Sequence, residues 1–121
     1  MLVRVLKPLA VVLGLGLVGA SAVMASPFGG PKFNHSRVEA FSTDVYRVDL
    51  HGDEYTEIEV RGDGDTDLDL FVYDQYGNLI VSDTDYGDYC SVWVLPYRAS
   101  TWRIEIVNLG NVYNEYTIEV Y

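Results

Sequence analysis

The chain has 121 residues, and its 18 Asp and Glu residues outnumber its 8 Lys and Arg residues, which gives a formal net charge of −10 at pH 7. This length allows one domain, not two. A surface this negative repels the phosphate groups of nucleic acids and of anionic lipids, so the charge argues against both as partners. Cations and basic proteins remain compatible with it.

The first 25 residues have the pattern of a secretory signal peptide. Arg4 and Lys7 form a positive start, residues 9–18 form an uncharged apolar run, and small residues follow. A small-x-small arrangement for signal peptidase ends at Ala22 and again at Ala25, and we favour cleavage after Ala25. The apolar stretch is at the lower limit for a membrane-spanning helix. We therefore expect a secreted or periplasmic protein without membrane attachment, whose 6 basic and 18 acidic residues give a mature charge of −12.

The remainder divides into a short leader and one β-rich region. Residues 26–40 predict a flexible leader, because Gly and Pro are frequent there and no periodicity is present. From residue 41 onward, apolar and polar residues alternate with period two, as half-buried strands do. The clearest alternating runs are 45–50, 55–61, 68–73, 102–107 and 115–121. Turn-forming residues separate these runs, so the pattern predicts an antiparallel sandwich or barrel over residues 41–121.

Cys90 is the only cysteine of the chain. No intramolecular disulfide can form, so the fold depends on its core. Cys90 alternates with Val92 and Val94, and we therefore expect it to be a small buried strand residue rather than a nucleophile.

One central segment resembles a known family. Asp67-Leu68-Asp69-Leu70-Phe71-Val72-Tyr73-Asp74, followed by Gly77-Asn78-Leu79, is similar to the main motif of bacterial pre-peptidase C-terminal domains. Residues 99–106 and 108–118 resemble the later strands of that family. The resemblance covers residues 41–121 and implies an all-β fold, a small antiparallel jelly-roll-like β-sandwich. It also implies an accessory module of exported enzymes, without catalytic residues, that in some members binds calcium or a protein substrate. Ser100 stands where the family usually has Gly.

Closely spaced aspartates form the candidate metal site. These residues are Asp63, Asp65, Asp67, Asp69, Asp83 and Asp85. Alternate aspartates on an extended loop can present several hard oxygen ligands to Ca²⁺. They do not form an EF-hand, because Leu68 occupies the sixth position where Gly is required. The second run, with Asp88, lies near the first if the turn at Gly77 closes a hairpin. The other interpretation is that these carboxylates solvate a loop and protect a sheet edge.

No catalytic motif is present after Ala25, so we expect no enzyme activity. Several aromatic residues lie on the polar phase of strands or beside turns, and we expect most of them to pack in the core or at the rim. They are Phe71, Tyr73, Tyr76, Tyr86, Tyr89, Tyr97 and Tyr113. The sequence thus predicts a non-catalytic module, with or without Ca²⁺, that binds an extracytoplasmic protein or polysaccharide. The alternative is a structural or chaperone-like envelope component without a metal site.

Overall fold

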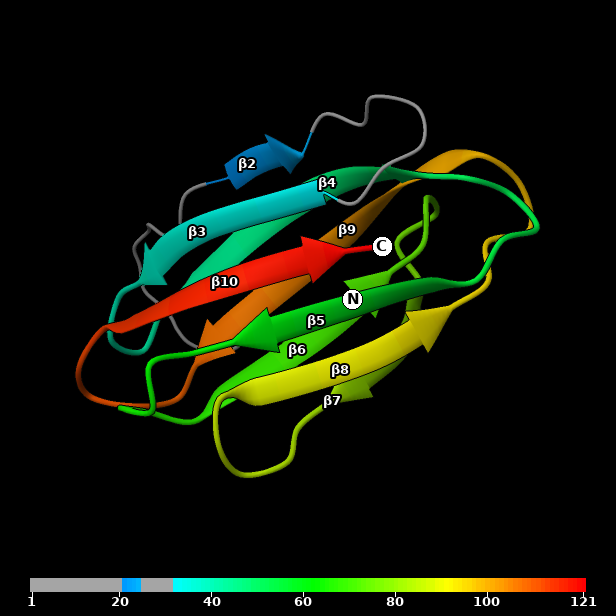
Figure 1. The fold of residues 1–121 in the computed structure, drawn as a ribbon. Coiled ribbons are helices and arrows are strands. Elements are labelled where there is room, and N and C mark those ends of the chain that lie inside the picture. Colours follow the sequence, from blue (N-terminus) through cyan, green and yellow to red (C-terminus); the bar gives the residue numbers. More distant parts are fainter. Residues whose placement is uncertain (1–20, 25–31) are drawn as a thin grey trace.

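Two stacked β-sheets make up the fold in the computed structural model, which describes residues 21–24 and 32–121 (Figure 1). The strands are β2 (Ser21–Met24), β3 (Lys32–Val38), β4 (Thr43–Leu50), β5 (Thr56–Arg61), β6 (Leu68–Tyr73), β7 (Leu79–Asp83), β8 (Tyr89–Val94), β9 (Ser100–Asn108) and β10 (Asn114–Val120). One sheet has the strand order β3-β10-β5-β8, and the other has the order β2-β4-β9-β6-β7. No helix occurs within these residues, so none of them forms a helix that could cross a membrane.

The connections make this a jelly roll. From β3 to β10 the chain changes sheet at every step except the hairpin of β6 and β7, and all pairings among these strands are antiparallel. Interleaved strands of this kind form the two Greek keys of a jelly roll. The predicted jelly-roll-like sandwich is therefore confirmed, and every predicted turn lies between two strands.

Alternation along the strands builds the core between the sheets. On β5, Thr56, Ile58 and Val60 are buried, as the alternation predicts, and the charged residues between them face away from the core. The buried apolar cluster comprises Val38, Tyr46, Val48, Leu50, Ile58, Val60, Leu68, Leu70, Val72, Cys90, Val92, Val94, Trp102, Ile104, Ile106, Tyr116, Ile118 and Val120. Cys90 belongs to this cluster, as predicted, and burial raises the pKa of its thiol to about 12. Since the thiolate is the nucleophile, this cysteine is unreactive.

The predicted leader is wrong from Lys32 onward. Residues 32–38 form β3, which pairs with β10 along its whole length and is an edge strand of its sheet. Its inward face is not evident from hydrophobic periodicity because two of its inward residues, Asn34 and Ser36, are polar. Asn34 is accommodated inside because its side-chain amide donates a hydrogen bond of 2.9 Å to the hydroxyl of Tyr46. Residues 26–31 lie outside the described residues.

Strand β2 lies within the predicted signal peptide. It runs parallel to β4, with Ser21 opposite Val45 and Met24 opposite Val48. Cleavage after Ala25 would remove all of β2 and leave a second sheet of four antiparallel strands. The cleavage site itself stays a prediction.

A polar network joins the two sheets inside the sandwich. The hydroxyl of Tyr116 on β10 donates to Asp44 Oδ2 on β4 at 2.6 Å, and it lies 2.6 Å from the hydroxyl of Tyr46. Asp44 is only 8 % exposed, and burial raises its pKa to about 6. Because each polar group is satisfied only in one alignment of the sheets, the network favours that alignment.

Candidate functional site

The two aspartate-bearing loops lie at the same end of the sandwich, as predicted from the turn at Gly77. The β5–β6 and β7–β8 connections are joined by backbone hydrogen bonds of 2.9 Å from Gly62 to Asp88 and from Leu68 to Gly87. Asp88 adds a side-chain link, because its Oδ2 accepts from the N–H of Gly64 at 2.5 Å. We call these two connections, residues 62–67 and 84–88, the acidic loops.

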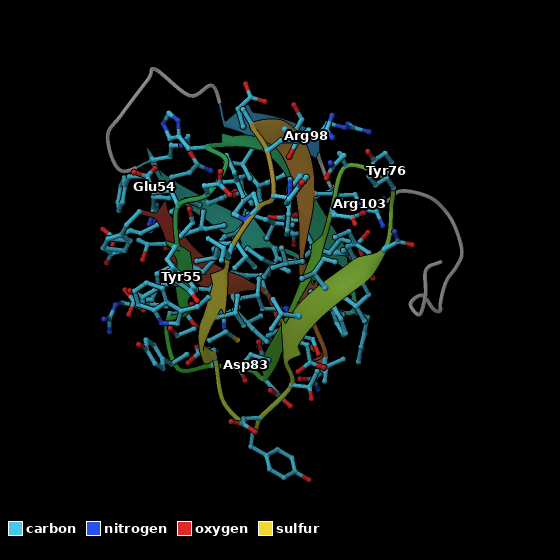
Figure 2. All side chains as sticks on the ribbon, turned by 90° about the vertical axis from the view of Figure 1, so that its right-hand side faces the viewer. Glu54, Tyr55, Tyr76, Asp83, Arg98 and Arg103 are labelled. Carbon is cyan, nitrogen blue, oxygen red and sulfur yellow. The ribbon has the colours of Figure 1, made fainter. Side chains whose placement is uncertain are left out.

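Two of the predicted metal ligands use both carboxylate oxygens on backbone groups. Asp63 accepts hydrogen bonds from the N–H groups of Asp65 at 3.0 Å and Glu115 at 2.9 Å. Asp83 accepts from Asp85 at 3.3 Å and from Ser91 at 3.1 Å. Strand β8 is at a sheet edge, so the Ser91 N–H has no neighbouring strand to pair with. Figure 2 shows Asp83 between the two sheets at this edge.

Asn114 connects the acidic loops, a structural role that the sequence did not indicate. Its side chain is fully buried, and its Oδ1 accepts from the N–H of Asp63 at 3.1 Å. Its Nδ2 donates to Asp88 Oδ2 at 3.0 Å and to Thr66 Oγ1 at 3.1 Å. One buried amide therefore holds the β5–β6 loop and the β7–β8 loop to β10.

Asp67 brings a buried carboxylate oxygen to the acidic loops. Its Oδ1 is buried and has no hydrogen-bond partner within the residues that the structure describes. Burial raises the pKa of Asp67, a hydrogen bond from the Gly87 backbone opposes that shift, and the negative charge of Asp88 adds to it. Asp65 and Asp85 are exposed, and Asp69 is half-buried on β6. In residues 21–24 and 32–121, no group of three or more His, Cys, Asp or Glu side chains is placed to hold a metal ion.

A second candidate site lies on the outer face of the β3-β10-β5-β8 sheet. Cross-strand pairing aligns Glu57 with Trp93, and it aligns Glu59 with both Ser91 and Glu119. Tyr121 lies beside Glu57, because its N–H donates to the Glu57 carbonyl at 2.9 Å. We call this surface the carboxylate–aromatic face. It is defined by Glu57, Glu59, Glu119, Tyr89, Trp93 and Tyr121.

Glu59 is the centre of this face and is only 6 % exposed, although it lies outside the core. Its Oε2 accepts from the hydroxyl of Tyr89 at 2.6 Å and from Arg61 at 2.9 Å, and its Oε1 accepts from the hydroxyl of Tyr121 at 3.1 Å. These donors stabilise the ionised form, so the pKa of Glu59 is lowered, with the Tyr89 hydrogen bond as the largest cause. Glu59 is therefore a carboxylate held in one position.

The neighbouring carboxylates are also held by hydroxyl groups. Glu57 accepts from Ser91 Oγ at 2.8 Å. Glu119 lies 2.7 Å from the Tyr121 hydroxyl that also lies near Glu59, so these two carboxylates share one donor. In the part of the chain that the structure describes, Arg61 is the one basic residue that forms an ion pair with any of these three glutamates. The aromatic rings beside them face solvent, and Trp93 is 59 % exposed.

The aromatic residues only partly follow the expected packing. Phe71 and Tyr73 are buried, as expected, although they alternate with the core residues of β6. The expectation is wrong for the other five, which are exposed: Tyr76, Tyr86, Tyr89, Tyr97 and Tyr113. Figure 2 shows Tyr76 on the side of the second sheet, and Tyr55 on the side of the carboxylate–aromatic face.

Comparison with known proteins shows the fold. No family model matches the sequence, and no curated protein matches it. The chain is similar in structure to other small β-sandwich domains. One is the pre-peptidase C-terminal domain of a Bacillus anthracis collagenase, at 11 % identity and a TM-score of 0.64, with 88 % of this chain and 100 % of that chain covered. The sequence-based resemblance to that type of domain is thereby confirmed at the level of structure.

A second set of similar structures consists of periplasmic lysozyme inhibitors. PliG of Aeromonas hydrophila, an inhibitor of g-type lysozyme, has 9 % identity and a TM-score of 0.62, with 85 % of this chain and 96 % of that chain covered. A mutant of the Escherichia coli inhibitor has 11 % identity and a TM-score of 0.55, over 85 % of this chain and 97 % of that chain.

Proposed function

We propose that this chain is an exported, non-catalytic module that binds a protein outside the cytoplasm. The carboxylate–aromatic face is the observation that carries the proposal. Exposed Trp and Tyr side chains over ordered polar partners are the composition of binding hot spots. An aromatic side chain such as Trp93 costs little conformational entropy to immobilise, and Glu59 is already fixed, so a partner meets a preorganised surface.

Further observations support the location outside the cytoplasm and the kind of partner. Residues 1–25 have the signal-peptide pattern, which delivers a protein to the periplasm or the exterior. The similar PliG structures are described as periplasmic and as inhibitors of a protein, g-type lysozyme. The mature charge of −12 favours a basic protein over an acidic one.

The test measures binding of the purified exported protein to a g-type lysozyme by biolayer interferometry, together with inhibition of cell-wall lysis. We expect binding that Trp93→Ala weakens at least about tenfold, a common loss at a hot spot. Tyr97→Ala removes an aromatic side chain outside this face that is even more exposed, at 82 % against 59 % for Trp93, and serves as the control. Binding that both variants weaken equally would contradict the assignment of the face. Binding of the polysaccharide substrate of lysozyme, with no binding of lysozyme itself, would contradict the proposed function.

We also propose that Ca²⁺ stabilises the acidic loops. The unpartnered Oδ1 of Asp67, next to the charge of Asp88, supports this proposal, because a cation would satisfy the oxygen and relieve the repulsion. Calorimetry with Ca²⁺ and with EGTA tests it. We expect a higher melting temperature with Ca²⁺, and we expect Asp67→Asn to abolish the increase. Asp53→Asn, in an exposed turn after β4, is the control. Identical melting curves in Ca²⁺ and EGTA would contradict a stabilising metal and favour the envelope component without one.

A further inference from the structure

We propose that the carboxylate–aromatic face recognises an arginine or lysine side chain of its protein partner, which binds over Trp93 and beside Glu57. This inference rests on the proposed function and names the chemistry that the partner must present. It follows from how the residues are ordered across three strands.

Three rows of side chains cross β8, β5 and β10 on this face. The first row is Tyr89, Arg61 and Thr117, and the second is Ser91, Glu59 and Glu119. The third is Trp93, Glu57 and Tyr121. Directly opposed side chains on adjacent strands have Cβ atoms about 5 Å apart, so neighbouring members of one row can contact the same bound group. The second row, with its two glutamates, thus lies between a row that contains Arg61 and a row that contains two aromatic residues and Glu57.

The first row shows how this face already holds a cation of its own. The guanidinium carbon of Arg61 lies 4.9 Å from the centre of the Tyr89 ring, and its Nη2 lies 2.9 Å from Glu59 Oε2. An aromatic face and a carboxylate together attract a cation more strongly than either does alone. The third row contains the same two elements, Trp93 and Glu57, without a described basic residue between them.

The carboxylate–aromatic face has a net negative charge, as binding of a cationic side chain requires. Glu57, Glu59 and Glu119 carry three negative charges, and Arg61 supplies one positive charge to them. Because the carboxylates of Glu57 and Glu119 already accept hydroxyl hydrogen bonds, their positions are set before a partner arrives. Trp gives the strongest cation–π attraction of the aromatic residues, and Trp93 is exposed enough to be covered by a guanidinium.

A carbohydrate is the other common occupant of an exposed Trp. A sugar ring carries no charge, so it would leave the negative charge of Glu57, Glu59 and Glu119 uncompensated, whereas an arginine or lysine side chain would compensate part of it. The arrangement therefore favours a cationic side chain over a sugar ring.

The test uses a penta-arginine peptide with the full exported chain at about 0.15 M salt, where long-range charge effects are screened beyond about 8 Å. Penta-citrulline has nearly the same shape without the charge and is the control ligand. The chain has two Trp residues, so the indole N–H signals of Trp93 and of the buried Trp102 give separate NMR reporters. We expect penta-arginine to shift the Trp93 signal and to leave Trp102 unchanged, and we expect no shift with penta-citrulline.

Two variants distinguish binding at Trp93 and Glu57 from general attraction to the negative charge of the protein. Glu57→Gln should weaken penta-arginine binding by about tenfold, and Trp93→Leu, which keeps an apolar side chain without a π face, should do the same. Asp85→Asn removes the same unit charge from the exposed loop between β7 and β8 and should change the affinity less than about twofold. Equal losses in Glu57→Gln and Asp85→Asn would overturn the proposal. A Trp93 shift with penta-citrulline, or with chitotriose at the same concentration, would also overturn it.

The outcome distinguishes this inference from the proposed function. If a lysozyme binds and Glu57→Gln binds it as tightly as the unmodified chain does, the function stands and the cationic seat is refuted. If no protein binds but penta-arginine shifts Trp93 in a Glu57-dependent manner, the cationic seat stands and the lysozyme assignment is refuted.

Discussion

Substitution of Asp44 by Asn tests whether ionisation of a carboxyl group inside the sandwich lowers the stability of the protein. Asp44 lies between the sheets and receives a hydrogen bond from the Tyr116 hydroxyl, with Tyr46 next along the network. Burial is the main cause that raises its pKa from 3.8 to about 6; the Tyr116 hydrogen bond lowers it, and the nearby charge of Glu39 adds to the increase. Asn keeps an acceptor for Tyr116 but cannot ionise.

The sign and size of the effect follow from proton linkage. Because the pKa is higher in the folded state than in the unfolded state, the contribution of Asp44 to stability is fully present below pH 4 and is lost as the pH rises to about 6. A difference of this size corresponds to about 3 kcal/mol in total, and the part between pH 4.5 and pH 7.5 amounts to about 2 kcal/mol. The Asn variant does not undergo this loss.

Urea unfolding followed by Trp fluorescence measures the effect at both pH values. We expect the free energy of unfolding of Asp44→Asn, relative to that of the unmodified chain, to be about 2 kcal/mol higher at pH 7.5 than at pH 4.5. Asp65→Asn, in an exposed loop, should show no such dependence. Tyr116→Phe removes the hydrogen bond that stabilises the ionised form, so it should move the titration of Asp44 to higher pH. A relative stability of Asp44→Asn that is the same at both pH values would refute the reasoning.

Three other predictions concern packing and processing. Asn114→Ala should lower the free energy of unfolding in urea by about 2–3 kcal/mol, because it leaves buried groups of both acidic loops unsatisfied, whereas the exposed Asn111→Ala should change it by less than about 0.5 kcal/mol. Gly52→Ala should cost about 1–3 kcal/mol in thermal melts, because its Cβ would lie 2.6 Å from the Arg98 Cα; an unchanged melting temperature would contradict this contact. Mass spectrometry of the exported chain should give Ser26 as the first residue, with the β-rich circular dichroism spectrum retained after loss of β2. A chain that still begins at residue 1 would refute signal cleavage.

The strands were predictable where the inward residues are apolar. Ile58 and Val60 on β5, or Ile104 and Ile106 on β9, alternate with charged residues, so each strand has one possible inward face. Strand β3 was not predictable in this way. Its inward Asn34 is accommodated through a hydrogen bond that it donates to a tyrosine on another strand, Tyr46. Local periodicity cannot reveal a polar residue that is buried through a distant partner.

The same limit explains which parts of the site were missed. The charged face of β5 was visible in the sequence, but the environment of Glu59 was not. Its partners Tyr89 and Tyr121 are 30 and 62 residues away along the chain, and the jelly-roll connections place them on its two flanks. A glutamate on an exposed strand face is ordinarily solvated, and only the arrival of β8 and β10 on either side makes this one a fixed carboxylate.

The acidic loops show why a count of carboxylates overestimates the number of oxygens available to a cation. Each aspartate brings two oxygens, but those of Asp63 and Asp83 accept hydrogen bonds from backbone N–H groups that the loops and the β8 edge leave unpaired. Since an unsatisfied N–H at such a position is costly, these two residues are needed by the fold with or without Ca²⁺. A cation at this end would therefore depend on Asp67. Asp67→Asn removes the negative charge of that side chain, so it should abolish the rise in melting temperature with Ca²⁺ and leave the melting temperature in EGTA unchanged or higher.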